Sequence, residues 1–202
     1  TEIYTLSLHD ALPISLRRVV RYFGDFPVEL QTNGIKLNRE FAKGDTGLID
    51  AMRRDGLNVI AFSVDTAELF VAYADLFNAL RDRGFVVRVT VNVTDMLPKE
   101  ISFDMLIELA KMGRVRQLSL RQITTPGNPV LDDDRSRETF EWIRRHQDAD
   151  TYRRLTDEMR AKCRYEIRRL PYGAVVYDYQ GVGVTYFDHC IQIGRASCRE
   201  RV

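Results

Sequence analysis

Four segments of this chain place hydroxyl, amide or charged side chains directly after a run of apolar residues. The four pairs are Thr32 and Asn33, Ser63 and Asp65, Asn92 and Thr94, and Arg121 and Gln122. In parallel α/β folds the carboxyl ends of the strands share one edge, and ligands bind at that edge. These groups suit a polar small molecule with ribose and amino-acid parts. The same residue types also cap helices that follow strands, so a purely structural role stays open.

The segments that carry these residues have the apolar content of strands. Strands are predicted at about 28–32, 57–63, 85–93 and 115–123,. They begin about 30 residues apart, which is the size of a βαβ unit. The sequence therefore predicts an α/β fold with a parallel sheet, either a (β/α) barrel or a doubly wound sheet.

Apolar stripes at helical spacing lie beside these strands. They predict helices over 16–23, 47–54, 65–83 and 101–112,. Asp65 begins a capping-box pattern at the start of the third helix. Glycines at positions 56, 84 and 113 are expected to end three of the helices, whereas 35–46 is expected to be a polar loop,.

The pattern changes beyond residue 128. Residues 132–169 are highly charged and predict two solvent-exposed helices, and residues 174–188 predict a β-hairpin with its turn at 180–183,. We therefore expect a barrel-like part over 15–128 and an extension of helices and a hairpin over 129–192.

Composition limits the classes of function. The chain has 202 residues, with 30 basic and 29 acidic side chains and a net charge of +1. This balance gives no electrostatic reason to expect nucleic acid or a membrane surface as a partner, and no apolar run approaches the roughly 20 residues of a membrane span. Three cysteines do not make a disulfide framework, so a cytoplasmic location is expected,. The expected partner is a small-molecule or peptide substrate of unknown identity.

Both ends of the chain resemble translated sequencing-adapter DNA. Residues 1–14 read TEIYTLSLHDALPI, and residues 193–202 read IGRASCRERV. The two stretches resemble one short adapter read in one frame and its reverse complement read in another. They are expected to be non-native and are set apart from the fold.

Three strand segments together resemble one enzyme family. LQTNG at 30–34, AFSVDT at 61–66 and VRVTVN at 87–92 are similar to the third, fourth and fifth strands of radical S-adenosylmethionine (radical SAM) enzymes, and QLSLR at 117–121 is similar to the sixth. The resemblance covers about Ser15 to Pro126. It implies a partial (βα)6 barrel, in which a [4Fe–4S] cluster reductively cleaves S-adenosylmethionine to start radical chemistry on a substrate that the sequence does not identify.

The resemblance also implies roles for six residues at the strand ends. Thr32 and Asn33 would line the cofactor pocket. Ser63 and Asp65 would contact the ribose or methionine part of S-adenosylmethionine. Asn92 and Arg121 would approach its adenine or carboxylate, or the substrate.

The chain departs from the family pattern in one major respect. Radical SAM enzymes hold the cluster with a CxxxCxxC loop after the first strand, and this motif is absent from the sequence. We therefore expect a C-terminal fragment that binds neither cluster nor cofactor by itself, has no catalytic residue or metal ligand of its own, and leaves the edge 28–31 unpaired. Cys190 either begins an auxiliary cluster motif or is a buried thiol.

Two other readings stay open. The chain could belong to a different cytoplasmic α/β-barrel enzyme, which should carry a catalytic lysine or a phosphate-binding glycine loop at a strand end; neither is evident. It could also be a non-catalytic binding domain on the same scaffold.

Overall fold

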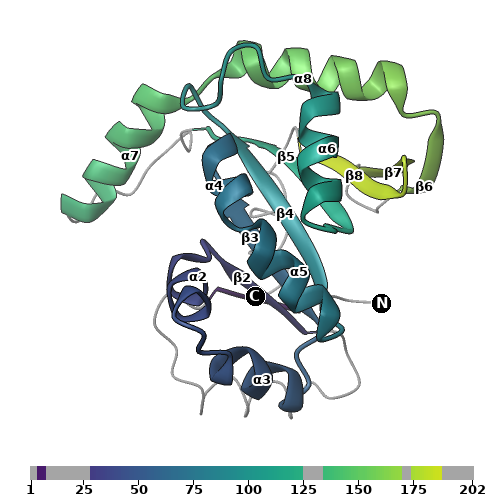
Figure 1. Ribbon diagram of the computed structural model, residues 1–202. Helices are drawn as coiled ribbons and strands as arrows, with labels where there is room; N and C mark the ends of the chain where they lie inside the picture. Colours follow the sequence, from purple (N-terminus) through teal and green to yellow (C-terminus); the bar gives the residue numbers. More distant parts are fainter. Residues whose placement is uncertain (1–3, 8–27, 125–133, 170–173, 188–202) are drawn as a thin grey trace, which may run out of the picture.

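The computed structural model describes residues 4–7, 28–124, 134–169 and 174–187. The helix expected over 16–23 lies outside these ranges. The strands are β1 (Tyr4–Ser7), β2 (Val28–Thr32), β3 (Val59–Val64), β4 (Val86–Val93), β5 (Gln117–Gln122), β6 (Tyr165–Arg169), β7 (Val175–Tyr179) and β8 (Val182–Phe187). The helices are α2 (Ile35–Ala42), α3 (Gly47–Arg54), α4 (Ala67–Ala72), α5 (Ala74–Asp82), α6 (Phe103–Met112), α7 (Asp134–His146) and α8 (Ala149–Lys162). The α/β fold predicted from the sequence is confirmed (Figure 1).

All the described strands form one sheet of eight strands, in the order β1-β2-β3-β4-β5-β8-β7-β6. Neighbours pair in parallel from β1 to β5 and again between β5 and β8, whereas β7 and β6 continue antiparallel. The first five strands follow the chain without a reversal of direction across the sheet. A doubly wound sheet requires such a reversal, so these strands do not have that topology. The sheet is open, because its end strands β1 and β6 do not pair with each other within the described residues.

The unreversed strand order determines where the helices lie. Crossovers between parallel strands are right-handed, so successive crossovers in one direction place their helices on one face of the sheet. Figure 1 shows α4, α5 and α6 on the same side of the strands, and Phe62 of β3 packs against Tyr73 and Phe77 on that side. Tyr186 of β8 is in the same register row as the apolar residues Val91 and Leu120, so it lies on the helix-covered face. Arg160 of α8 lies over the Tyr186 ring, which places α8 on that face as well.

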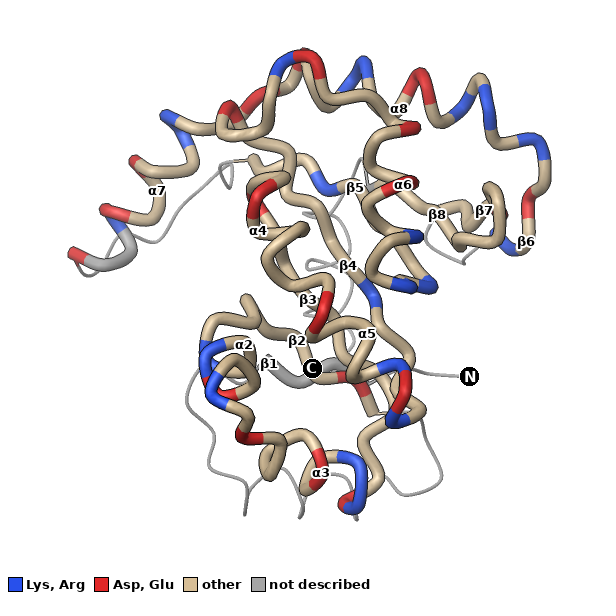
Figure 2. The backbone as a smooth tube through the Cα atoms, in the orientation of Figure 1, with Lys and Arg blue, Asp and Glu red and all other residues tan. Residues whose placement is uncertain are grey.

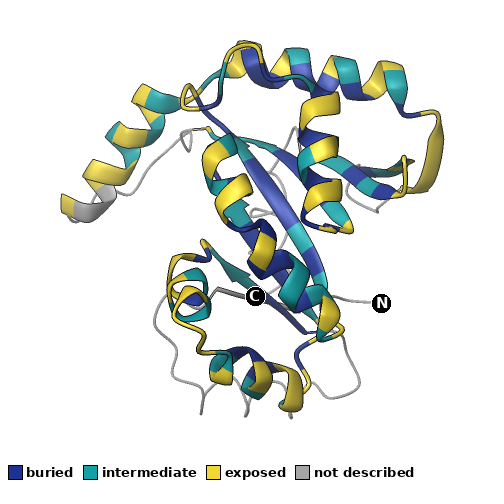
Figure 3. Ribbon diagram, in the orientation of Figure 1, coloured by how far each residue is buried: buried dark blue, intermediate teal, exposed yellow. Residues whose placement is uncertain are grey.

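The two faces of the sheet differ sharply in composition. The helix-covered face is apolar; along β4 it carries Val87, Val89, Val91 and Val93, each 0% exposed. Side chains alternate between the two faces along a strand, so the residues between these valines point to the opposite face, and most of them are polar. We call this the polar face, and its central members are Glu29, Gln31, Ser63, Arg88, Thr90, Asn92, Gln117, Ser119 and Arg121. Figure 3 shows that the central strands are largely buried.

Two predicted segments differ from the sequence expectation. The expected polar loop after Gly34 is helix α2, which buries Leu37. The single helix expected over 65–83 is two helices that meet at Tyr73, and the cap of the first is Thr66, whose Oγ1 accepts a hydrogen bond from the Leu69 amide at 3.2 Å. The Asp65 capping box is therefore wrong, because Asp65 turns to the polar face instead.

Three helices end in the same hydrogen-bond pattern, but the third uses an unexpected residue. In α3 and α5 the left-handed position after the helix is a glycine, Gly56 or Gly84,. Gly113 ends α6 as predicted, but the left-handed position after this helix is Arg114, with φ 52°. Gly113 is needed where it is, because a Cβ there would lie 2.9 Å from Cδ2 of Phe77. A left-handed backbone at a residue with a Cβ costs about 1–2 kcal/mol.

The C-terminal extension joins the sheet. The charged region forms the two expected helices, but α8 is not simply solvent-exposed, because it buries Leu155 and Met159 in the core. An additional strand, β6, follows, which the sequence did not predict. The predicted hairpin is confirmed as β7 and β8, with a tighter turn at Gln180-Gly181, both of which have positive φ,. Since β8 pairs in parallel with β5, the extension adds three strands to the side of the sheet formed by β5.

The edge of β2 is paired, contrary to the sequence expectation. Tyr4–Ser7 runs parallel to Val28–Gln31 and covers this edge. No helix in the described ranges combines the length and apolar content needed to cross a bilayer.

Candidate functional site

Three of the six predicted site residues meet at the carboxyl ends of adjacent strands. Nδ2 of Asn92 donates a hydrogen bond to Oδ1 of Asp65 at 2.7 Å. Arg121 is the register partner of Asn92 on the neighbouring strand. We call Asp65, Asn92 and Arg121 the rim. Strands β3, β4 and β5 bring these residues together, although 27 residues separate Asp65 from Asn92.

The rim retains polar atoms that can bind a ligand. Nε of Arg121 is buried and has no hydrogen-bond partner within the described residues. Such a donor is costly to leave unpaired, so an acceptor brought by a ligand would be favoured there. Arginine also offers a planar fork of donors that suits carboxylate and phosphate groups.

The backbone holds the rim in place. The Asp65 carbonyl accepts a hydrogen bond from Oγ1 of Thr94 at 3.4 Å, and that hydroxyl accepts one from the Met96 amide at 3.2 Å. Thr94 is 0% exposed. This pair of contacts ties the end of β4 to the turn that follows β3, so Asp65 is positioned by buried groups.

Ser63 lies on the polar face one row below the rim. It is in register with Thr90, which is in register with Ser119. Thr90 is 7% exposed and Ser119 is 4% exposed, so these two hydroxyl groups are shielded from solvent, whereas Ser63 is half-buried. Hydroxyls can both donate and accept hydrogen bonds, so the row can adapt to a ligand of either polarity.

Thr32 and Asn33 do not lie with the rim. Thr32 is in register with Phe62 on the helix-covered face, and its Oγ1 accepts a hydrogen bond from the Gly34 amide at 3.0 Å. The side chain of Asn33 is exposed, and its Oδ1 accepts a hydrogen bond from the Ile35 amide at 3.2 Å. Both side chains shape the turn into α2, which matches the structural role that the sequence left open.

The sequence reading missed a charged network deeper on the polar face. Nη1 of Arg88 lies 2.5 Å from Oε2 of Glu29, and Nε of Arg88 donates to Oε1 of Gln117 at 2.7 Å. Glu29 is 1% exposed and also accepts a hydrogen bond from Gln31 at 3.2 Å. The strand between β2 and β4 contributes only the small side chain of Ala61 in this row, which leaves room for Arg88 to reach across.

The described residues do not fit an iron–sulfur cluster. They contain no group of three or more histidine, cysteine or acidic side chains placed to hold a metal. Cys163, at the end of α8, is buried, and burial raises the pKa of its thiol to about 11, so it is protonated at neutral pH,. A cluster needs several thiolates close together. Cys190 lies outside the described ranges.

Sequence comparisons do not assign a family. No protein-family model matches the chain, and no curated protein is detectably similar to it. The geometry of the rim and the polar face is therefore the main structural indication of function.

Proposed function

We propose that this chain is the later part of a radical SAM barrel and supplies half of its S-adenosylmethionine pocket. The observation that supports this most is the unreversed order of β2 to β5, with helices on one face and a partly buried polar face opposite. That layout is the one expected of a segment of a (βα) barrel wall, whose inner face would line the ligand site. The resemblance of β2 to β5 to radical SAM strands distinguishes this proposal from other barrel enzymes.

In the proposal the rim binds the polar parts of the cofactor. The Asp65 carboxylate accepts hydrogen bonds from a ribose hydroxyl, Asn92 fixes the orientation of Asp65, and Arg121 pairs with the methionine carboxylate,. Ser63 adds a hydroxyl beneath them. The pocket is completed by parts of the barrel wall that precede β2 in the complete enzyme, which acts in the reducing cytoplasm on a small-molecule or peptide substrate.

The chain as written is expected to bind no cluster. After anaerobic reconstitution with iron and sulfide, we expect well under one [4Fe–4S] per chain by iron analysis and no stable absorption band of such a cluster. The reason is the absence of three neighbouring thiolates within the described ranges,. A stoichiometric cluster would contradict this part of the proposal.

The role of the rim is tested by introducing Asp65→Asn into the protein expressed from the complete reading frame. Replacing a charged acceptor by an amide should weaken S-adenosylmethionine binding about tenfold or more, since a hydrogen bond to a charged group contributes about 1.5–3 kcal/mol. The matched control is Asp157→Asn, because Asp157 forms an exposed ion pair with Arg160 on α8. Calorimetric titration checks the prediction, and equal affinities for the two variants would contradict the rim assignment.

A further inference from the structure

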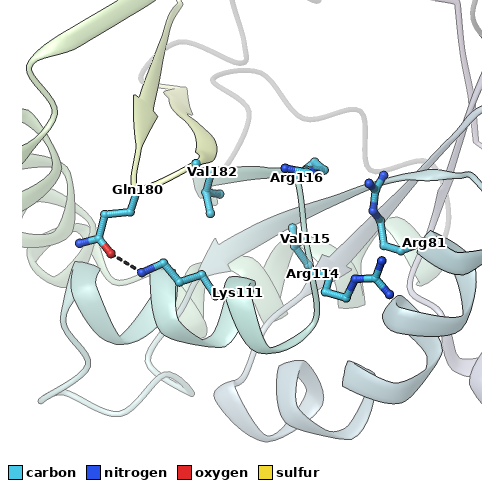
Figure 4. Close-up of a pocket in the computed structure, with 8 residues that line it drawn as sticks. Arg81, Lys111, Arg114, Val115, Arg116, Gln180 and Val182 are labelled. Carbon is cyan, nitrogen blue, oxygen red and sulfur yellow. Dashed lines mark hydrogen bonds between the residues drawn. The ribbon is translucent and has the colours of Figure 1, made fainter.

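A second polar site lies at the amino-terminal ends of β5 and β8, at the end of the sheet opposite the rim. A cavity of about 290 Å³ opens there, and its lining includes Arg81, Lys111, Arg114, Arg116 and Gln180. These residues come from the end of α5, the end of α6, the turn after it and the hairpin turn. Figure 2 shows a group of basic positions where α6 ends, and Figure 4 shows three guanidinium groups on one side of the cavity.

Positive charge in this cavity is only partly compensated. Lys111 pairs with Glu108 at 2.9 Å and also donates to Oε1 of Gln180, and Arg114 pairs with Asp82. Both acidic partners are exposed, at 70% and 64%, so these pairs contribute little,. Arg81 and Arg116 have no carboxylate partner within the described ranges. The cluster thus holds more cations than the neighbouring acidic groups neutralise.

The backbone holds the Arg81 side chain in the cavity lining and leaves one of its donors unpaired. Its Nη1 donates to the Phe85 carbonyl at 2.7 Å, while its buried Nε has no acceptor among the described residues. Burial and the nearby charges of Arg116 and Arg114 lower the pKa of Arg81. Mutual repulsion of this kind is relieved when an anion binds between the cations.

Arg114, which lines the cavity, has a strained backbone conformation. Arg114 has φ 52°, at the position that Gly56 and Gly84 occupy after α3 and α5. Glycine would be more stable at that position, so the arginine there carries a conformational cost. Residues held in such conformations cluster at ligand sites, which favours a binding role for the Arg114 side chain in the cavity lining,.

We propose that this cavity binds a small molecule through a phosphate group. Several cations that line one compact cavity match the charge of a phosphate dianion, and arginine forks bind its oxygens in pairs,. The cavity is at the lower end of the volume range of small-molecule sites, which suits one phosphate and a short attached group. The site lies across the sheet from the rim and does not depend on the radical SAM proposal.

Calorimetric titration of the purified chain with inorganic phosphate, at about 0.15 M sodium chloride, tests the proposal. We expect saturable binding at one site, at least tenfold weaker in Arg116→Gln and unchanged in Arg39→Gln, a control on the exposed surface of α2. Non-saturable binding by the unmodified chain, or equal weakening in both variants, would overturn the proposal.

The variant Arg114→Gly should be more stable against thermal unfolding than the unmodified chain. Relief of the left-handed arginine should raise the midpoint of thermal unfolding by about 2–4 °C. Loss of one cation from the cavity should at the same time weaken phosphate binding several-fold. A variant that is stabilised and binds phosphate as tightly as the unmodified chain would show that Arg114 is not part of the site, contrary to the proposal.

Discussion

Arg88→Met is expected to lower the free energy of unfolding by about 3 kcal/mol. The substitution keeps an unbranched apolar stem but removes the guanidinium, whose Nη1 lies 2.5 Å from Oε2 of Glu29. Glu29 is 1% exposed, so its carboxylate would remain buried without a counter-ion,. The estimate is at the low end for a broken buried pair, because the Arg88 side chain is 25% exposed and water can partly replace it.

Urea unfolding at neutral pH measures this effect, and two further variants separate its causes. The double variant Glu29→Gln with Arg88→Met should recover most of the loss, since no buried charge remains unpaired. Arg144→Met is the surface control; its partner Glu141 is 43% exposed, and removing this pair should cost less than about 1 kcal/mol,. If Arg88→Met cost no more than Arg144→Met, the charged network would not be a buried part of the polar face.

Gly34→Ala is expected to destabilise the fold by about 2–4 kcal/mol. Gly34 follows β2 with φ 76°, and a Cβ there would lie 2.7 Å from Cδ1 of Phe62 and 2.9 Å from Cε2 of Tyr73. Neither ring can move freely, because Phe62 and Tyr73 are 0% and 3% exposed in the core. The cost therefore combines a left-handed backbone with overpacking.

Gly44→Ala is the matched control for this prediction. Gly44 has φ 80°, but a Cβ there would have no atom within 4 Å. Its substitution should cost only the backbone part, about 1 kcal/mol. Denaturant unfolding of both variants gives the difference between the two costs. Equal losses would mean that the turn after β2 does not pack tightly against the Phe62 and Tyr73 rings.

The sequence predicted those parts of the fold that depend on local pattern. The predicted bounds of β2 and α3 agree with the structure, and the bounds of β3, β4 and β5 agree within two residues. Alternation of valine with polar residues in β4 reflects a strand with one apolar and one polar face,. The hairpin was visible because a glycine lies between two runs of aromatic and β-branched residues.

Parts of the fold that depend on distant contacts were not predictable. Helix α2 is polar except for a short stripe, and it forms because Leu37 packs into the core,. Gly113 ends α6 as the sequence predicted, yet the left-handed conformation lies at Arg114, because contact with Phe77 requires glycine at position 113. A steric constraint from another helix leaves no trace in local sequence.

The candidate site was predictable in part. Asp65, Asn92 and Arg121 were identified because polar residues ended three strands, and parallel pairing brought them to one edge. Thr32 lies on the other face, because the residue that ends β2 has the opposite parity in the register,. Glu29, Arg88 and Gln117 were missed because their pairing depends on that register, which a single sequence does not define.

The central claim is that this chain is the later part of a radical SAM barrel, and sequencing the genomic DNA upstream of the codon for Ser15 tests it most directly. The proposal predicts an open reading frame that continues upstream in frame and encodes a CxxxCxxC motif within about 100 codons, followed by a further strand and helix before Ser15. A start codon in frame near Ser15, with no such motif upstream, would contradict it.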